Sequence, residues 1–347
     1  MSIVEKEESA SEQLLNMSSL FTPWALRVAA SLGLADKICD GANNAEELAR
    51  LTGSHPDSLA RVMRHLVNIG VLAVDTSGQF SLTDLGKVLR SDHPSRLVQI
   101  LDQNDPLIQA IDEATPGIVG CVKSGTPAWA SYHGADFWSY LSSNSSLSGT
   151  FDNTMEIQGK RVGEELAATY DWQSIGRVAD IGGGVGVILG SLLRSNLSLL
   201  GMLVDLPITV SRAEIRLKSL GLANRVELYG RSFFDELPAG ADVFLLSHVL
   251  HDWPDNKSAE ILARCKEASP PHGRILVVER LVADLGEESS LSVSNRDLAV
   301  MVILGSRERS EEEFRLLGES VGLVLSRVRP LIVEQSVFLL EFLPTDK

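Results

Sequence analysis

A glycine-rich turn constrains this chain more than any other stretch. Residues 178–186 read VADIGGGVG, and an apolar run follows at 187–193. The pattern predicts a short buried strand, a tight turn and a helix that begins at once. Glycines let the backbone approach a ligand closely, and the free N–H groups of the helix N-terminus then face that ligand. The turn therefore predicts a binding site, with a tight turn that binds nothing as the alternative.

Two classes of ligand use such a turn. A dinucleotide fingerprint has the spacing G-x-G-x-x-G, and Val187 stands where its third glycine would lie. The spacing D-x-G-x-G-x-G in 180–186 instead resembles the first motif of S-adenosylmethionine (SAM) methyltransferases. A second apolar run ends at Asp205, where a carboxylate can accept both hydroxyls of a ribose. The predicted cofactor-binding residues of this region are Asp180, Gly182, Gly184, Asp205 and Leu206.

Composition limits the partners that the chain can have. Its 347 residues suffice for two domains, and a hydrophobic content of 44% supports a large core. A formal net charge of −15 argues against nucleic acid or an anionic membrane as the main partner. Three cysteines without a CxxC pair predict neither a disulfide framework nor a zinc site. With no signal-peptide pattern and no membrane-length apolar run, we expect a cytoplasmic protein.

The first hundred residues predict a separate, mostly helical domain. Helical patterns at 12–38, 44–51 and 57–70 precede a hairpin at 71–82, an order that looks like a winged helix-turn-helix. DNA binding is one interpretation, but acidic residues offset the arginines of the second helix and no basic arm flanks it. Dimerisation is the other interpretation. It is favoured by apolar residues beyond one core stripe, although ordinary core packing explains them equally well: Leu20, Phe21 and Trp24.

Residues 101–165 predict linking helices that contribute to a substrate pocket. Aromatic side chains gather in this segment, where they can wall a flat apolar ligand or simply fill a core. We nominate four pocket residues, two from this segment and two from a later helix: Trp138, Met155, Asp297 and Met301.

Residues 166–347 alternate strands and helices, which predicts a doubly wound, Rossmann-like α/β domain. The apolar run 241–246 leads into Ser-His-Val-Leu-His-Asp-Trp. A phenol has a pKa near 10, so only about one in a thousand is ionised at pH 7, and a histidine is suited to take its proton. His251, beside Asp252 at a strand end, is our candidate base. His248 competes: it faces away from His251 on an extended chain and shares its face in a helical turn.

Five motifs occur in order along the chain: 180–186, 204–207, 232–235, 251–253 and 305–314. Together they resemble the metal-independent O-methyltransferases of the caffeic-acid and hydroxyindole type, in their bacterial natural-product branch. The resemblance implies a SAM cofactor, a small aromatic hydroxyl substrate, no metal and a homodimer formed by the first domain. It makes His251 the general base, Asp252 its neighbour, and Glu279 and Glu308 the acids that orient it. It also makes Ser232 and Phe233 the adenine contacts.

The chain departs from that family's pattern at two places, residues 231–232 and residue 247. The family usually has an acid where Ser232 stands and often a glycine at Arg231; plant members place a lysine near the adenine where Ser247 stands, which makes Ser247 a cofactor-site position. Some relatives are hydroxylases, decarboxylases or cyclisation catalysts, so a SAM-binding protein with a non-methylating activity is the main alternative. A SAM-sensing DNA regulator and a nicotinamide dehydrogenase are more distant ones.

Overall fold

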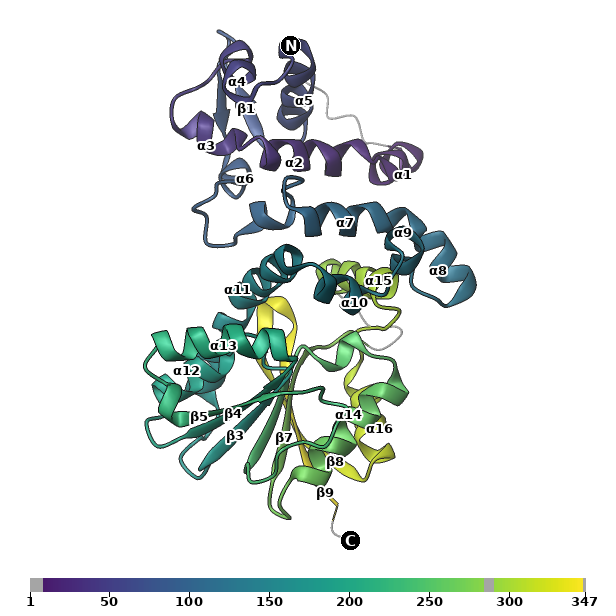
Figure 1. Ribbon diagram of the computed structural model, residues 1–347. Helices are drawn as coiled ribbons and strands as arrows, with labels where there is room; N and C mark the ends of the chain where they lie inside the picture. The colour runs from purple at the N-terminus through teal and green to yellow at the C-terminus, as the bar shows by residue number, and fades with distance from the viewer. Residues whose placement is uncertain (1–8, 284–289, 346–347) are drawn as a thin grey trace. The chain divides into compact units, whose positions relative to one another are not determined.

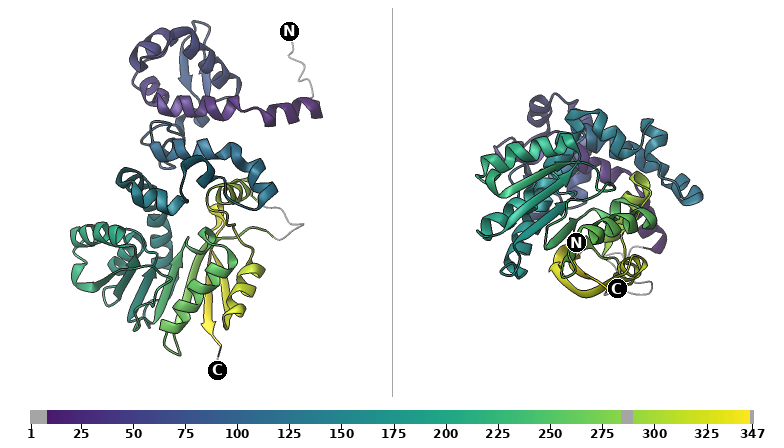
Figure 2. Two further views of the ribbon diagram at one scale, coloured as in Figure 1. Left: turned by 45° about the vertical axis from the view of Figure 1, so that its right-hand side comes forward. Right: turned by 60° about the horizontal axis from the view of Figure 1, so that its bottom comes forward.

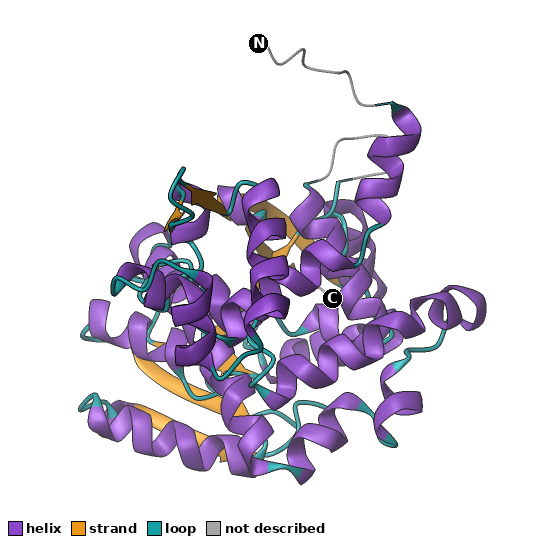
Figure 3. Ribbon diagram, turned by 90° about the horizontal axis from the view of Figure 1, so that it is seen from above, coloured by secondary structure: helices purple, strands orange, loops and turns teal. Residues whose placement is uncertain are grey.

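Two sheets organise the chain, which the computed structural model describes over residues 9–283 and 290–345. A two-stranded hairpin belongs to one unit, Met1–Ala110, and a seven-stranded sheet belongs to the other, Ile111–Lys347. Helices make up most of the rest, as the colouring of Figure 3 shows. From Ile111 onward the expected linking helices fall within the second unit.

The first unit follows the predicted order of helices and hairpin, with one correction. The helical pattern at 12–38 is three helices, because the backbone is extended at Ser19 and left-handed at Gly33 (φ 58°). Asn44 is the cap of the fourth helix, since its side chain accepts from Glu47 N. The elements are α1 (Ala10–Ser18), α2 (Phe21–Ser31), α3 (Leu34–Cys39), α4 (Ala45–Thr52), α5 (Pro56–Asn68), β1 (Leu72–Val74), β2 (Phe80–Leu82), α6 (Asp84–Lys87) and η1 (Leu97–Ile100), with α7 (Pro106–Ala114) crossing the boundary.

The second unit is built on a sheet with the strand order β5-β4-β3-β6-β7-β9-β8. The first five strands of this order are mutually parallel, and β9 runs antiparallel to both β7 and β8. The predicted doubly wound α/β fold is therefore confirmed. The strands are β3 (Arg177–Ile181), β4 (Leu200–Asp205), β5 (Val226–Gly230), β6 (Val243–Ser247), β7 (Arg274–Arg280), β8 (Leu323–Ile332) and β9 (Val337–Pro344).

Helices cover both faces of this sheet (Figures 1 and 2). Because side chains alternate along a strand, β3 sends Val178 into the core beneath α11, α12 and α13, and sends Ala179 into the core beneath α14 and α16. The remaining elements of the unit are η2 (Thr115–Gly117), α8 (Ile118–Ser124), α9 (Trp129–His133), α10 (Phe137–Ser143), α11 (Ser145–Thr169), α12 (Val187–Ser195), α13 (Pro207–Ser219), η3 (Ala223–Arg225), η4 (Leu250–Asp252), α14 (Asp255–Ala268), α15 (Leu291–Ile303), α16 (Glu311–Ser320) and η5 (Val333–Gln335).

The order of the strands determines where a ligand can bind. From β3 the chain winds outward through β4 to β5, then returns to place β6 on the other side of β3. Open α/β sheets bind ligands at such a switch point, beyond the carboxyl ends of the strands. Here the glycine turn follows β3, and the histidine motif follows β6. The fold therefore brings the two most informative stretches of the sequence to one crevice edge.

Candidate active site

The glycine turn is shaped by close contacts at two positions and by a left-handed backbone. Gly182 is left-handed (φ 68°), and a Cβ on it would lie 2.9 Å from the Val249 side chain. A Cβ on Gly183 would lie 2.7 Å from the carboxyl carbon of Asp180. Gly184 is also left-handed (φ 57°), yet a Cβ there meets nothing within 4 Å. Glycine is thus required by contact at 182 and 183, and by backbone conformation at 184.

Two carboxylates lie around this turn in different environments. Asp205 Oδ2 accepts from Gly184 N at 2.9 Å and Oδ1 from Leu206 N at 2.7 Å, which leaves lone pairs for further donors. Asp180 is only 1% exposed, and its Oδ2 has no hydrogen-bond partner among the described residues. Burial, with the nearby charge of Asp205, raises the pKa of Asp180 to about 7. Asp205 is thus placed to bind a ligand, while Asp180 lies beneath the turn.

The predicted adenine contacts lie beside the same turn. A Cβ on Gly182 would be 3.5 Å from the Phe233 ring, so this ring borders the turn directly. Ser232 uses its hydroxyl to accept from Phe234 N at 3.2 Å, and the Ser247 hydroxyl lies 3.2 Å from His248 Nδ1. Leu206 follows Asp205 with 43% of its surface exposed. Phe233 and Leu206 therefore offer apolar surface, and the two serines are engaged in local hydrogen bonds.

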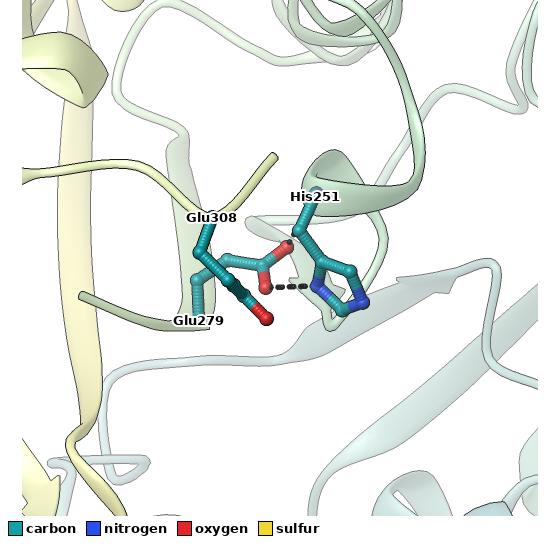
Figure 4. Close-up of side chains that lie close together, drawn as sticks. All are labelled: His251, Glu279 and Glu308. Atoms are coloured by element: carbon teal, nitrogen blue, oxygen red, sulfur yellow. Dashed lines mark hydrogen bonds and ion pairs between the residues drawn. The ribbon is translucent and has the colours of Figure 1, made fainter. Parts of the chain in front are cut away.

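Glu279 organises the histidine turn. This fully buried residue near the end of β7 accepts through Oε1 from the backbone N–H groups of Val249, Leu250 and His251, at 3.0, 2.8 and 3.3 Å. Its Oε2 lies 2.6 Å from Nδ1 of His251 (Figure 4). Burial opposes the charged carboxylate, but the histidine and the backbone donors outweigh it and lower the pKa of Glu279. An ionised Glu279 must accept, so His251 donates from Nδ1 and keeps Nε2 for other partners.

Nε2 of His251 faces two groups of opposite character. Asp252 Oδ1 lies 3.1 Å from it, and Nη2 of Arg296 lies 3.3 Å from it. His251 is 3% exposed, and burial disfavours its charged form. The carboxylates of Glu279 and Asp252 overcome this penalty and raise the pKa of His251. His251 consequently holds its proton more tightly than an ordinary imidazole does, and its Nε2 lies beside both a carboxylate and a cation.

Glu308 reaches the site from the loop before α16. Its carboxylate points toward the side chains of His251 and Glu279 (Figure 4). One nitrogen or oxygen atom from each of the three side chains lies within 4.8 Å of the others. The hydrogen bond of Glu308 goes to Arg296, whose Nε donates to Oε1 at 2.9 Å. Asp297, predicted to bind substrate, accepts from Glu308 N through Oδ1 at 2.8 Å. Asp297 therefore holds the loop that carries Glu308.

Arg309 completes the support of the histidine turn. It is 1% exposed and donates to the carbonyl oxygens of Leu250 and Trp253, each at 2.8 Å, and to Asp255. Glu279 binds the N–H groups at the start of η4, and Arg309 binds the carbonyl groups of its first residue and of its C-cap, Trp253. Both ends of this short helix are thus satisfied by buried charged side chains, which orients His251.

The two histidines differ in their hydrogen-bond partners. His248 is a left-handed residue (φ 54°) that turns the chain from β6 into η4, and its ring lies 5.9 Å from that of His251, nearly perpendicular to it. Its Nε2 has no partner among the described residues, and burial lowers the pKa of His248 well below its usual range. The two rings are therefore neighbours, as the helical alternative predicted, but only His251 is hydrogen-bonded to an acid by its side chain.

Aromatic residues continue from the histidine motif to the linking helices. The rings of Trp138 and Trp253 are almost parallel, with centroids 6.4 Å apart, and Trp253 also meets Phe233 edge-on at 5.9 Å. Trp138, a pocket candidate, is thus joined through Trp253 to the ring beside the glycine turn. The other candidates, Met155 on α11 and Met301 on α15, are partly buried.

Three residues of this site were missed by sequence reasoning. In the sequence, Arg296 resembles a residue on a solvated helix face. It lies 45 positions after His251, and no local pattern predicts that the two are in contact. Arg309 belongs to the Arg-Glu-Arg element from which only Glu308 was selected. Trp253 belongs to the histidine motif but was given no role. For Arg309 and Trp253, membership of a motif was the available signal.

Comparisons with known proteins give a consistent result. A family model described as the O-methyltransferase domain matches residues 118–323, and one described as the O-methyltransferase dimerisation domain matches residues 14–92. The 2,7-dihydroxy-5-methyl-1-naphthoate 7-O-methyltransferase of Streptomyces carzinostaticus is 38% identical over 91% of this chain and 93% of its own length. Aclacinomycin 10-hydroxylase RdmB of Streptomyces purpurascens is 37% identical over 91% of this chain and 85% of its own length.

A solved structure extends the similarity to three dimensions. It is an O-methyltransferase (NcsB1) from neocarzinostatin biosynthesis, in complex with SAM and 2-hydroxy-5-methyl naphthoic acid. It is 37% identical in sequence, has a TM-score of 0.85, and the match covers 95% of this chain and 98% of that one. Within the described residues, no helix is long and apolar enough to cross a membrane.

Proposed function

This chain belongs to the SAM-dependent O-methyltransferase family, and on that premise we propose that it methylates a hydroxyl group of a small aromatic natural product with His251 as the general base. The observation that carries the proposal is the buried pair of His251 and Glu279, joined at 2.6 Å. The relatives support the substrate class, since one acts on a dihydroxynaphthoate and another binds a hydroxynaphthoic acid.

The glycine turn and its neighbours fit the cofactor. The absence of side-chain space at Gly182 and Gly183 gives a cradle for backbone contacts, and Asp205 retains lone pairs for the ribose hydroxyls. Phe233 and Leu206 offer apolar surface for the adenine. When bound, SAM supplies a methyl group activated by its sulfonium sulfur. Asp180, buried beneath the turn, supports the cradle and carries no direct contact in this proposal.

His251 deprotonates the acceptor through Nε2. The hydroxyl must take the place of Asp252 at this nitrogen, because both need the same position 3.1 Å from it. As the proton moves to Nε2, the imidazolium that forms is stabilised by Glu279 at Nδ1. Glu279, itself held by three backbone N–H groups, keeps the ring in one tautomer and one orientation. The chain thus supplies base, orientation and charge stabilisation.

The cluster of His251, Glu279 and Glu308 has the residue types of a metal site, but both carboxylates are already hydrogen-bonded. Glu279 accepts four hydrogen bonds, and Glu308 is paired with the Arg296 cation. Binding a metal ion would require breaking these bonds and desolvating a cation beside Arg296. We therefore assign the cluster to proton transfer, consistent with methyl transfer from a sulfonium, which requires no metal.

A non-methylating activity is the second candidate, because a relative of 37% identity is a hydroxylase. The His251–Glu279 pair favours methyl transfer, since it provides the base that a neutral hydroxyl needs. Mass spectrometry separates the two. Methyl transfer adds one CH2 to the acceptor and yields S-adenosylhomocysteine, whereas hydroxylation adds one oxygen.

The first unit is proposed to form a homodimer. Residues 14–92 match the dimerisation domain of the family, and α1 buries none of its residues within the chain. Large apolar side chains on α1 and at the start of α2 are left exposed, as a subunit interface requires: Leu14, Leu15, Met17, Leu20 and Phe21.

The base is tested by replacing His251 with alanine and supplying SAM with a panel of hydroxynaphthoates. We expect turnover to fall by roughly 10²–10⁴-fold while the dissociation constant for SAM stays near that of the wild type. His272→Ala is the matched control, since that histidine is 78% exposed. Near-wild-type turnover of the His251 variant would remove the proposed role.

A further inference from the structure

Arg296 is an unusual neighbour for a catalytic base. Its Nη2 lies 3.3 Å from His251 Nε2, the nitrogen that must receive the proton of the acceptor. Any acceptor whose hydroxyl reaches Nε2 therefore also comes within reach of a permanent cation, because an arginine guanidinium does not deprotonate in proteins.

The position of this guanidinium is determined by its other contacts. Its Nε donates to Glu308 Oε1 at 2.9 Å, and the Glu308 carboxylate is 1% exposed. The backbone of Glu308 is in turn bound by Asp297, one residue after Arg296 on α15. Glu308 thus anchors Arg296 at Nε, and α15 in turn holds Glu308 through Asp297. The Arg296 side chain is still 28% exposed, so an incoming molecule can reach it. Such anchoring reduces the entropy lost when the terminal donors bind a ligand.

The two nitrogens present complementary chemistry to an acceptor. Once His251 has lost its Nε2 proton, that nitrogen accepts and Nη2 of the guanidinium donates, with 3.3 Å between the two nitrogens. An acceptor matches these two nitrogens if it has a hydroxyl that donates to Nε2 and, next to it, an oxygen that accepts from Nη2. In an aromatic molecule with both groups on neighbouring ring carbons, the two oxygens lie about 2.7 Å apart, the length of an O–H···O hydrogen bond. Each oxygen can then meet its own nitrogen.

We propose that Arg296 contacts the substrate and selects aromatic acceptors whose reacting hydroxyl stands next to a carbonyl or carboxylate oxygen. The assignment rests on the proposed function of His251. Loss of the hydroxyl proton makes the acceptor more negative, so the same cation also stabilises the oxygen that attacks. An acceptor with an isolated hydroxyl leaves Nη2 without its partner oxygen and binds more weakly.

Binding to the full-length protein saturated with S-adenosylhomocysteine tests the proposal, because this complex cannot turn over. The probes are 3-hydroxy-2-naphthoate, 1-hydroxy-2-acetonaphthone and 2-naphthol, which carry a neighbouring carboxylate, a neighbouring ketone and no second oxygen. We expect the wild type to bind the first two at least about tenfold more tightly than 2-naphthol, as one charge-assisted hydrogen bond allows. Comparing the first two distinguishes a carboxylate from a carbonyl partner.

In Arg296→Gln we expect this preference to disappear, so that the three probes bind with similar affinity. Arg194→Gln, a change of an exposed arginine on α12, should keep the preference. If Arg296→Gln fails to fold because Glu308 is left unpaired, the double variant Arg296→Gln/Glu308→Gln carries the same comparison. Equal or undetectable binding of all three probes by the wild type, or a preference that survives loss of the guanidinium, overturns the proposal. Product mass spectrometry tests methyl transfer separately, so the proposed role of Arg296 can fail while the proposed methyl transfer stands.

Discussion

A single imidazole between two carboxylates determines the chemistry at the residue scale. Glu279 and Asp252 flank the two nitrogens of His251 and raise its pKa. The free enzyme therefore retains the histidine proton to a higher pH than an ordinary imidazole would. Since kcat/KM reports the protonation state of the free enzyme, activity should rise as the pH increases through this raised pKa.

Asp252→Asn should shift that rise. Removing one of the two charges lowers the pKa of His251, so the acidic limb of a kcat/KM profile should move to lower pH by roughly one unit. The measurement is an initial-rate series from neutral to alkaline pH. Glu267→Gln, on exposed α14 surface, is the control that should leave the limb in place. An unchanged limb in Asp252→Asn would mean that this carboxylate does not act on the catalytic nitrogen.

At the scale of elements, the turn between β3 and α12 depends on two different properties of glycine. Gly182 combines a left-handed backbone with contacts from Val249 and Phe233, whereas Gly221, after α13, is left-handed (φ 72°) with nothing within 4 Å. The left-handed conformation is a local property of the backbone. The lack of space for a side chain arises because the loop after β6 packs against the turn after β3, at the switch point of the sheet.

Alanine substitutions separate these properties. Gly221→Ala should cost about 1–2 kcal/mol in the free energy of unfolding, which is the cost of a left-handed L-residue. Gly182→Ala should cost roughly 2–4 kcal/mol, because overpacking against Val249 adds to the same strain, and it should weaken SAM binding as well. Urea unfolding and SAM titration measure the two effects. Equal costs at the two positions would contradict the close packing of the turn.

At the scale of the whole molecule, α1 and the start of α2 expose apolar side chains that a partner subunit would bury. A nine-residue helix with no buried residue is marginal in water on its own. Phe21 is 80% exposed and Leu20 is 73% exposed at the start of the next helix. A second copy of the chain, packed on this surface, would bury these side chains and stabilise both helices.

Phe21→Glu should therefore shift the protein from dimer to monomer. Light scattering coupled to size exclusion should give twice the chain mass of 37.6 kDa for the wild type and about that mass for the variant. Leu197→Glu changes an equally exposed leucine, 83% exposed, in the second unit and should leave the dimer intact. A Phe21→Glu protein that remains dimeric would place the interface elsewhere.

The sequence was most informative where a function depends on neighbours along the chain. Three local patterns led to the fold, the family and the proposed base. They are the spacing from Asp180 to Gly186, the alternation of strands and helices, and the pairing of a histidine with Asp252. The break at Gly33 was missed even so, because the apolar pattern continues through it while the left-handed backbone ends the helix.

Only the tertiary structure shows which residues distant in sequence surround His251. Glu279 lies 28 residues from it and Arg296 lies 45 residues from it, and both are brought there by the winding of the sheet. Such contacts depend on strand order and on the packing of α15, which no local spacing encodes. The resemblance to a family anticipated Glu279, but only the structure assigned Glu308 to an arginine and placed that arginine beside the catalytic nitrogen. The sequence thus determined the cofactor class and the histidine that we propose as the base, and the fold determined the electrostatic surroundings of that histidine.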